Sequence, residues 1–78
     1  MRVKVYPNPS NGVVVVECAG CEISRIEVLD ISGKKVFERI IKEEVGYIKV
    51  ELSLQKGTYI MNVTDKRGLM SSQKIMVE

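Results

Sequence analysis

Cys18 and Cys21 carry the most reactive side chains of this 78-residue chain, and their C-x-x-C spacing allows three kinds of chemistry. The pair can supply half of a zinc site, form a redox-active dithiol or close a local disulfide. Zinc needs four ligands, and the chain has no other cysteine and no histidine. A thioredoxin-like dithiol needs a helix N-terminus that lowers the thiol pKa, and no such helix is predicted here. A disulfide that ties a turn and a pair of free thiols both remain open, and we expect no cofactor.

Asp30 and Asp65 are the candidates for a paired-carboxylate acid–base site, but both occur in the pattern V-x-D-x-x-G. An aspartate that starts a type I turn accepts hydrogen bonds from backbone N–H groups two residues further on. Gly33 and Gly68 then supply the positive φ that closes such a hairpin. Nothing in the sequence places the two carboxylates together, and hairpins of a sandwich often lie at opposite ends. We therefore predict that both aspartates form turns.

The stretch YPNPSNG (residues 6–12) has a serine, but the chain contains no histidine that could act as its base. Ser10 is therefore not a candidate nucleophile. Pro7 and Pro9 fix φ and favour extended conformations at the residues before them. Gly12 tolerates left-handed backbone geometry. We interpret the stretch as a stiff change of chain direction that leads into the following run of valines.

The overall composition is that of a single small globular domain covering residues 1–78, with 45% hydrophobic and 28% charged residues. A net charge of +2 is too balanced to indicate nucleic-acid binding. No apolar run approaches the length of a membrane span, so we expect no membrane insertion. The first residues lack the pattern of a signal peptide, and we expect the segment to come from a longer protein.

Hydrophobic residues alternate with polar ones along most of the chain, a period typical of strands that bury one face. Turn signals separate these runs about every 8–12 residues, which predicts an all-β sandwich. Only Phe37–Val45 has a weak helical period, and we expect a strand there. The predicted strands cover residues 2–6, 13–17, 23–29, 35–41, 47–52 and 58–63, followed by a last strand that ends in residues 74–78.

Four motifs follow one another in order: VYPNPSNGVVVVE, IEVLDISGKKV, LSLQKGTYIMNVTDKRG and SSQKIMVE. Over essentially the whole chain this arrangement resembles the C-terminal sorting domain of the type IX (Por) secretion system of Bacteroidetes. The resemblance implies a small immunoglobulin-like sandwich of about seven antiparallel strands. It also implies a recognition module that is not an enzyme.

The resemblance further implies which partners the domain meets. A covalently attached cargo such as an exported protease or adhesin precedes it. The folded domain is recognised in the periplasm by the outer-membrane secretion machinery, and a sortase-like C-terminal signal peptidase commonly removes it, at a point upstream of the domain. The cargo then reaches the outer-membrane surface or the medium.

By position, the family motif maps to residues that we expect to be mostly structural, with the glycines supplying backbone freedom and the tyrosine packing in the core. These are Pro7, Asn8, Pro9, Gly12, Asp30, Gly33, Lys34, Gly57, Tyr59, Asp65 and Gly68. The candidate recognition strand is Gln73, Lys74, Ile75, Met76, Val77 and Glu78. A terminal edge strand offers unpaired backbone groups and side chains to a partner. The cysteines and the acidic last residue depart from the family pattern. In the periplasm, Cys18 and Cys21 can close a disulfide or pair between chains.

Two other functions compete with the sorting hypothesis. An immunoglobulin-like adhesion or carbohydrate-binding module would show an exposed aromatic platform or an acidic calcium loop, and neither is evident in the sequence. A metal or redox protein would depend on Cys18 and Cys21.

Overall fold

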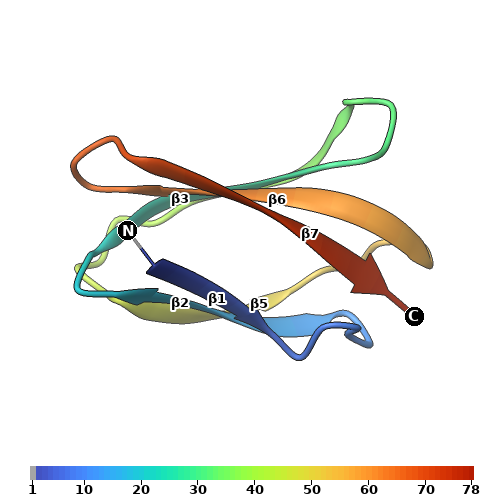
Figure 1. Cartoon of the computed structure of the whole chain (residues 1–78), viewed down its shortest axis with the longest axis horizontal. Helices are drawn as coiled ribbons and strands as arrows, with labels where there is room; N and C mark the ends of the chain where they lie inside the picture. Colours follow the sequence, from blue (N-terminus) through green and yellow to red (C-terminus); the bar gives the residue numbers. More distant parts are fainter. Residues whose placement is uncertain (1) are drawn as a thin grey trace.

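The computed structural model describes residues 2–78, so that Met1 of the predicted domain lies outside the described residues. The described chain forms seven strands and no helix (Figure 1). The strands are β1 (Arg2–Tyr6), β2 (Val13–Ala19), β3 (Ile23–Leu29), β4 (Lys35–Ile40), β5 (Tyr47–Glu51), β6 (Gly57–Asp65) and β7 (Met70–Val77). In the part of the chain that the structure describes, no helix is long and apolar enough to cross a membrane.

The strands form two antiparallel sheets that pack face to face, as Figure 1 shows. One sheet has three strands in the order β1-β2-β5, and the other has four in the order β4-β3-β6-β7. The predicted all-β sandwich is therefore confirmed. The weakly helical window is a strand only up to Ile40, and residues 41–46 are irregular. Ile41, the predicted last residue of this strand, lies outside it. Its side chain is buried in the core and is 2% exposed.

The core lies between the sheets and follows from the period-two pattern of the strands. In β2, for example, Val14 and Val16 point inward and are buried, while Val13, Val15 and Glu17 are only half-buried. The other buried apolar residues are Val5, Cys18, Ile23, Ile26, Val28, Ile41, Val50, Leu52, Tyr59, Met61, Val63, Ile75 and Val77.

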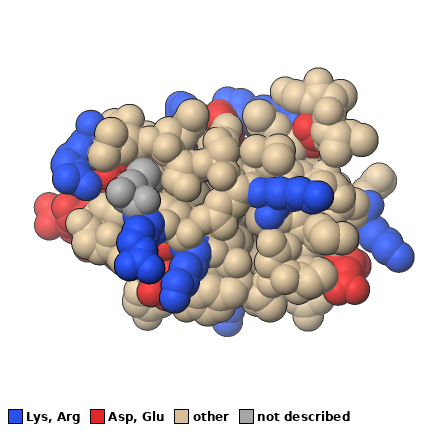
Figure 2. Space-filling model, in the orientation of Figure 1, with Lys and Arg blue, Asp and Glu red and all other residues tan. Residues whose placement is uncertain are grey.

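The edge strands β1 and β7 belong to different sheets but meet on one side of the sandwich (Figure 1). The side-chain amide of Gln73 in β7 donates a hydrogen bond to the carbonyl of Val3 in β1. The N-terminal motif and the C-terminal motif therefore come together on this side of the molecule. Figure 2 shows that the same face is mostly uncharged, with lysine and arginine side chains crossing it and acidic ones at its margins.

Candidate recognition site at the terminal strand

The terminal strand β7 lies between two segments that both belong to the family motif. On one side it pairs with β6 along its full length, where Gly57 is opposite Val77 and Tyr59 is opposite Ile75. On the other side, residues 7–10 run along the C-terminal half of the strand. The structure therefore brings the opening motif and the G-x-Y motif together on the last strand.

Asn8 binds the outer edge of β7 with both ends of its side-chain amide. Its Nδ2 donates to the carbonyl oxygen of Lys74 at 3.1 Å, and its Oδ1 accepts from the N–H of Met76 at 3.0 Å. Pro7 and Pro9 on either side have no N–H and cannot donate to a strand. A side-chain amide carries one donor group and one acceptor, like a peptide group. Asn8 therefore supplies the hydrogen bonds that the prolines cannot make.

Ser10 continues this contact through its backbone. Its N–H donates to the carbonyl of Met76 at 2.9 Å, and its carbonyl accepts from the N–H of Glu78 at 2.8 Å. The two bonds form an isolated parallel bridge centred on Val77. Ser10 is buried, and the peptide bonds preceding both prolines of the loop are cis. We call residues 8–10 and their bonds to β7 the Asn8–Ser10 contact.

The Asn8–Ser10 contact changes what the terminal strand offers to a partner. Alternate residues of an antiparallel strand point their backbone groups toward the same side. Here the even-numbered residues face away from β6, and the bonds to Asn8 and Ser10 satisfy the carbonyl of Lys74, both groups of Met76 and the N–H of Glu78. The expectation that this strand offers unpaired backbone groups is therefore wrong for its C-terminal half.

The side chains of the same strand remain available. Lys74 and Met76 are exposed on the outer face of the four-stranded sheet, and Met76 retains 45% of its surface. Ile75 and Val77 point the other way and are at most 4% exposed. The strand thus has one row of side chains fixed in the core and one row displayed outside.

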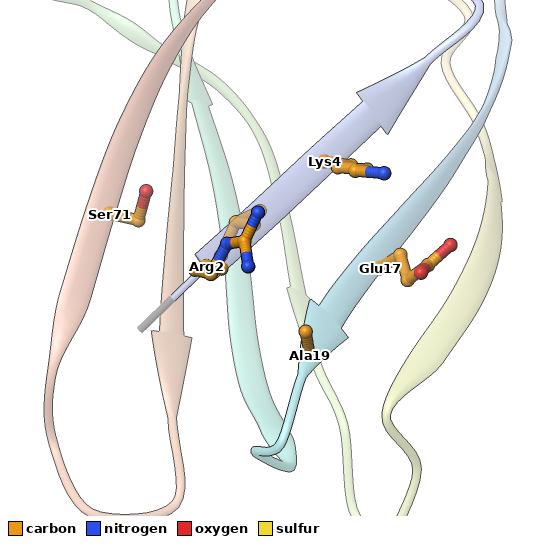
Figure 3. Close-up of a pocket in the computed structure, with 6 residues that line it drawn as sticks. Arg2, Lys4, Glu17, Ala19 and Ser71 are labelled. Atoms are coloured by element: carbon orange, nitrogen blue, oxygen red, sulfur yellow. The ribbon is translucent and has the colours of Figure 1, made fainter.

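A pocket of about 480 Å³ lies beside the N-terminal half of the same strand (Figure 3). Its lining comes from β1, β2 and β7 and consists of Arg2, Val3, Lys4, Glu17, Ala19 and Ser71. In Figure 3 the side chains of Lys4 and Glu17 lie on the far side of β1 from Ser71. Among the described residues that line the pocket, the hydroxyl of Ser71 therefore has neither Lys4 nor Glu17 beside it.

Asp30 forms the β3–β4 turn, as its sequence pattern predicts. Its Oδ1 accepts hydrogen bonds from the N–H of Ser32 at 2.9 Å, the hydroxyl of Ser32 at 2.6 Å and the N–H of Lys34 at 3.0 Å. Gly33 follows with φ +88°, a value that a residue with a Cβ rarely adopts. The bonds from Ser32 and Lys34 lower the pKa of Asp30.

Asp65 forms the β6–β7 turn in the same way, but its carboxylate is buried. Its Oδ1 accepts from the N–H groups of Arg67 and Leu69, both at 2.9 Å, and Gly68 has φ +89°. Burial opposes ionisation of Asp65, but the bonds from the Leu69 and Arg67 amides and the charge of Arg67 outweigh it and lower the pKa.

The two aspartates lie at opposite ends of the four-stranded sheet and form no carboxylate pair. Asp65 is opposite Ile23 at the start of β3, whereas Asp30 follows Leu29 at the end of that strand. Within residues 2–78, no group of three or more His, Cys, Asp or Glu side chains is arranged to hold a metal ion.

Cys18 and Cys21 are joined by a disulfide at the connection between β2 and β3. Cys18 is buried in the core, and its N–H donates to the carbonyl of Gly46 at 2.7 Å. Sulfurs bonded to each other present no thiolate to a metal or a substrate. The disulfide closes the turn that carries the chain from the three-stranded sheet to the four-stranded sheet.

In the G-x-Y element, the tyrosine has the expected structural role and the glycine does not. Tyr59 is buried as predicted, and its hydroxyl donates to the carbonyl of Gln55 at 2.6 Å. Gly57 does not have a positive φ, so the expectation that it supplies backbone freedom is wrong. A Cβ at this position would meet the Tyr59 ring at 3.7 Å, an ordinary contact distance.

Two tyrosines form an exposed aromatic pair that the sequence did not reveal. Tyr6 in β1 is 43% exposed and Tyr47 in β5 is 66% exposed. In the register of the sheet, Glu17 is directly opposite Tyr47, and its carboxylate accepts the hydroxyl hydrogen of Tyr6 at 3.0 Å. This hydrogen bond raises the pKa of Tyr6. The two tyrosines could not be paired from the sequence, because it is the position of β2 between β1 and β5 that brings them to the same face.

Sequence reasoning also missed the backbone contact of Ser10 with the last strand. It placed Gln73 in the candidate recognition strand but did not predict its hydrogen bond to Val3. The signal for the Asn8–Ser10 contact was an asparagine held between two prolines. An extended segment that lacks two backbone donors, yet contains an amide side chain, is suited to cover the edge of a strand.

Solved structures with similar folds place the chain among immunoglobulin-like β-sandwiches. A DUF3244-family protein from Bacteroides vulgatus, described as having this fold, superposes with a TM-score of 0.76 and 16% identity over 97% of this chain and 83% of its own. CopC from Methylosinus trichosporium OB3b superposes with a TM-score of 0.53 and 20% identity over 99% of this chain and 85% of its own. At these identities the likeness concerns the fold alone. No curated protein matches the sequence significantly.

The family model described as "secretion system C-terminal sorting domain" matches residues 4–78, nearly the whole chain. The chain belongs to this family, the C-terminal sorting domains of type IX secretion. It is a non-catalytic secretion signal, recognised by the type IX machinery, that directs export across the outer membrane to the surface or the medium.

Proposed function

We propose that the type IX machinery recognises this domain through the terminal strand, residues 73–78. The observation that carries the proposal is the division of that strand into two rows of side chains. Ile75 and Val77 anchor it in the core, while Lys74 and Met76 stand on the outer face of the sheet. A partner can therefore contact the outer row without unfolding the domain.

The other motif residues support this surface rather than contact the partner. Tyr59 and Gly57 hold β7 from the side of β6, and Asn8 holds it from the outer edge. The turns at Asp30 and Asp65 fix the hairpins at the two ends of the sheet. In this proposal a substitution at a turn affects export through folding, whereas one at Lys74 or Met76 affects recognition directly.

The course of export follows the family pattern. Residues 1–78 act as one domain that is covalently preceded by a cargo and is recognised while folded in the periplasm. A sortase-like signal peptidase then cleaves upstream of the domain, and the cargo reaches the outer-membrane surface or the medium. The match to the sorting family over residues 4–78 supports this course.

The test is an export assay with a periplasm-targeted fluorescent reporter fused to residues 1–78 in a type IX-competent bacterium. The double variant Lys74→Ser/Met76→Ser changes only the exposed row of β7. Its matched control, Tyr47→Ser/Lys49→Ser, changes two exposed residues on the outer face of the other sheet. We expect the β7 variant to leave the reporter in the periplasm and the control to export it.

Equal export of the two double variants would refute recognition through the outer row of β7. Export of the parent fusion must also disappear when the secretion pore is deleted, because otherwise the reporter leaves the cell by another route. A parent fusion that stays folded in the periplasm would show that residues 1–78 are not a sufficient signal.

A second candidate, an adhesion or carbohydrate-binding role, is favoured only by the exposed pair Tyr6 and Tyr47. Two rings flanking Glu17 can stack on sugars while the carboxylate binds hydroxyl groups. Affinity electrophoresis in gels containing neutral or anionic polysaccharide tests it. Retardation of the parent protein that is lost in Tyr47→Ala would support the role, and equal migration of the two would exclude it for those polysaccharides.

A further inference from the structure

We infer that Asn8 is a positioning residue for recognition, because it holds the terminal strand in the sheet in the form that the secretion machinery contacts. The inference rests on the proposed recognition through residues 73–78. It assigns the P-N-P motif a role in displaying Lys74 and Met76, in addition to its role as a connection between β1 and β2.

The argument starts from what holds the end of β7. Its bonds to β6 continue to Val77, which is opposite Gly57, the first residue of β6. Among residues 2–78, the partner found beyond this point is Ser10, whose carbonyl binds the N–H of Glu78 at 2.8 Å. The end of a strand frays where no contact with a neighbouring segment ties it down. The Asn8–Ser10 contact is what ties the strand down on its outer side.

The contribution of Asn8 is local, because its side chain is exposed to solvent while Ser10 and Val77 are buried. Water competes for exposed hydrogen bonds, so loss of the Asn8 bonds changes global stability little. The same loss releases the N–H of Met76 and the carbonyl of Lys74, and the strand end opens more often. A recognition defect in an Asn8 variant would therefore arise without general unfolding.

Asn8→Asp is the informative substitution because it keeps the size of the side chain. One carboxylate oxygen still accepts the N–H of Met76, but the other replaces the donor Nδ2 and faces the carbonyl of Lys74, 3.1 Å away in the parent. Two acceptor oxygens at that distance repel each other, so the contact loosens. Asn8→Ala removes both bonds without adding charge and serves as the second variant.

The chain offers a matched control three residues away. Asn11 is exposed in the same loop, and Asn11→Asp makes the same change of charge. None of the hydrogen bonds found within residues 2–78 joins the Asn11 side chain to β7. Val28→Ala, a substitution in the core of β3, controls for general loss of stability.

The first measurement is amide hydrogen exchange by NMR on the 78-residue chain. Loss of one good hydrogen bond corresponds to about a five- to tenfold change in the opening equilibrium. We expect the Met76 and Glu78 amides to exchange about five- to tenfold faster in Asn8→Asp and Asn8→Ala. Every amide in Asn11→Asp should exchange at the parent rate. Unchanged exchange at Met76 and Glu78 would overturn the inference.

The second measurement is export of the reporter fusion. We expect the two Asn8 variants to export less than the parent, by the same factor as the fraction of molecules whose strand end is closed, while Asn11→Asp and Val28→Ala export like the parent. Faster exchange with undiminished export would overturn the inference, because the machinery would then not require the strand to be held. An equal loss of export in Val28→Ala would also overturn it, since general stability would explain the defect.

The outcome for Lys74→Ser/Met76→Ser separates this inference from the function on which it rests. If that variant exports normally, recognition through the outer row of β7 fails whatever Asn8 does. If it fails to export while Asn8→Asp exports normally, the recognition surface is correct and only the positioning role of Asn8 is refuted.

Discussion

Reduction of the Cys18–Cys21 disulfide should destabilise the domain by a measurable and calculable amount. The bond joins residues three positions apart, so the closed loop contains four residues. It ties the turn through which the chain passes from β2 in one sheet to β3 in the other. Reduction leaves the native contacts of both strands in place, and its effect acts mainly on the unfolded chain.

The magnitude follows from the loop length. Closing a four-residue loop removes about 6 cal/mol/K of chain entropy from the unfolded state, which is about 2 kcal/mol at 25 °C. A domain of this size is stable by only about 4–12 kcal/mol in total. About 2 kcal/mol corresponds to a fall in the midpoint of thermal unfolding of about 8–16 °C. The loss is therefore large compared with the error of a thermal scan.

The assay is thermal unfolding followed by far-UV circular dichroism, with and without a phosphine reductant. Cys21→Ser is the matched variant, because it leaves Cys18 in the core as a small apolar residue. We expect the reduced parent and the variant to unfold at similar, lowered midpoints, and the reductant to leave the variant unchanged. Quantification of thiols before and after reduction confirms the redox state of each sample. Two titratable thiols in a reduced parent that unfolds at the original midpoint would refute the loop-entropy reasoning.

Three further predictions concern single side chains. Tyr59→Phe should cost about 1 kcal/mol in the free energy of unfolding, because it removes the hydrogen bond to the carbonyl of Gln55 while keeping the buried ring; urea denaturation measures it. The folded-state pKa of Asp65 is lowered, so its ionisation stabilises the fold above the ordinary carboxyl pKa, and this contribution is lost as the pH falls below about 4 through the folded-state pKa. Thermal midpoints between pH 2 and 6 should therefore fall less steeply in Asp65→Asn. Glu17→Gln should lower the pKa of Tyr6, as measured by ultraviolet titration of the phenolate.

Each of these has a contrary outcome that is equally clear. An unchanged urea midpoint in Tyr59→Phe would show that the hydroxyl bond adds nothing to stability. A pH profile of Asp65→Asn with the slope of the parent would mean that other carboxyl groups account for the acid sensitivity. Identical phenolate titrations of the parent and Glu17→Gln would remove the hydrogen bond as the cause of the raised pKa.

Local chemistry explains why the turns were predictable from sequence. An aspartate followed by glycine three residues later satisfies its own turn with bonds to amides two and four residues away, as both Asp30 and Asp65 do. Both partners lie within five residues of sequence, so no distant strand decides the outcome. The alternating pattern located the strands for the same reason, since the direction of each side chain depends on its immediate neighbours in the chain.

Contacts between distant segments could not be predicted in this way. Asn8 and Met76 are separated by 68 residues, and Gln73 and Val3 by 70. The same separation explains why the terminal strand was expected to have a free backbone edge, because the segment that covers it lies at the other end of the chain. Tyr6 and Tyr47 likewise share a face only because β2 pairs with both of their strands.

The sequence by itself determined the fold class, the turn aspartates and, through its ordered motifs, the sorting family. These features depend on residues that are neighbours in the chain or on patterns that recur along it. Only the tertiary structure decided that the P-N-P loop covers the last strand, that one row of that strand is displayed, and that the two cysteines bond. Strand pairing between the two ends of the chain depends on how the sheets pack, and this is a property of all seven strands together rather than of any one segment.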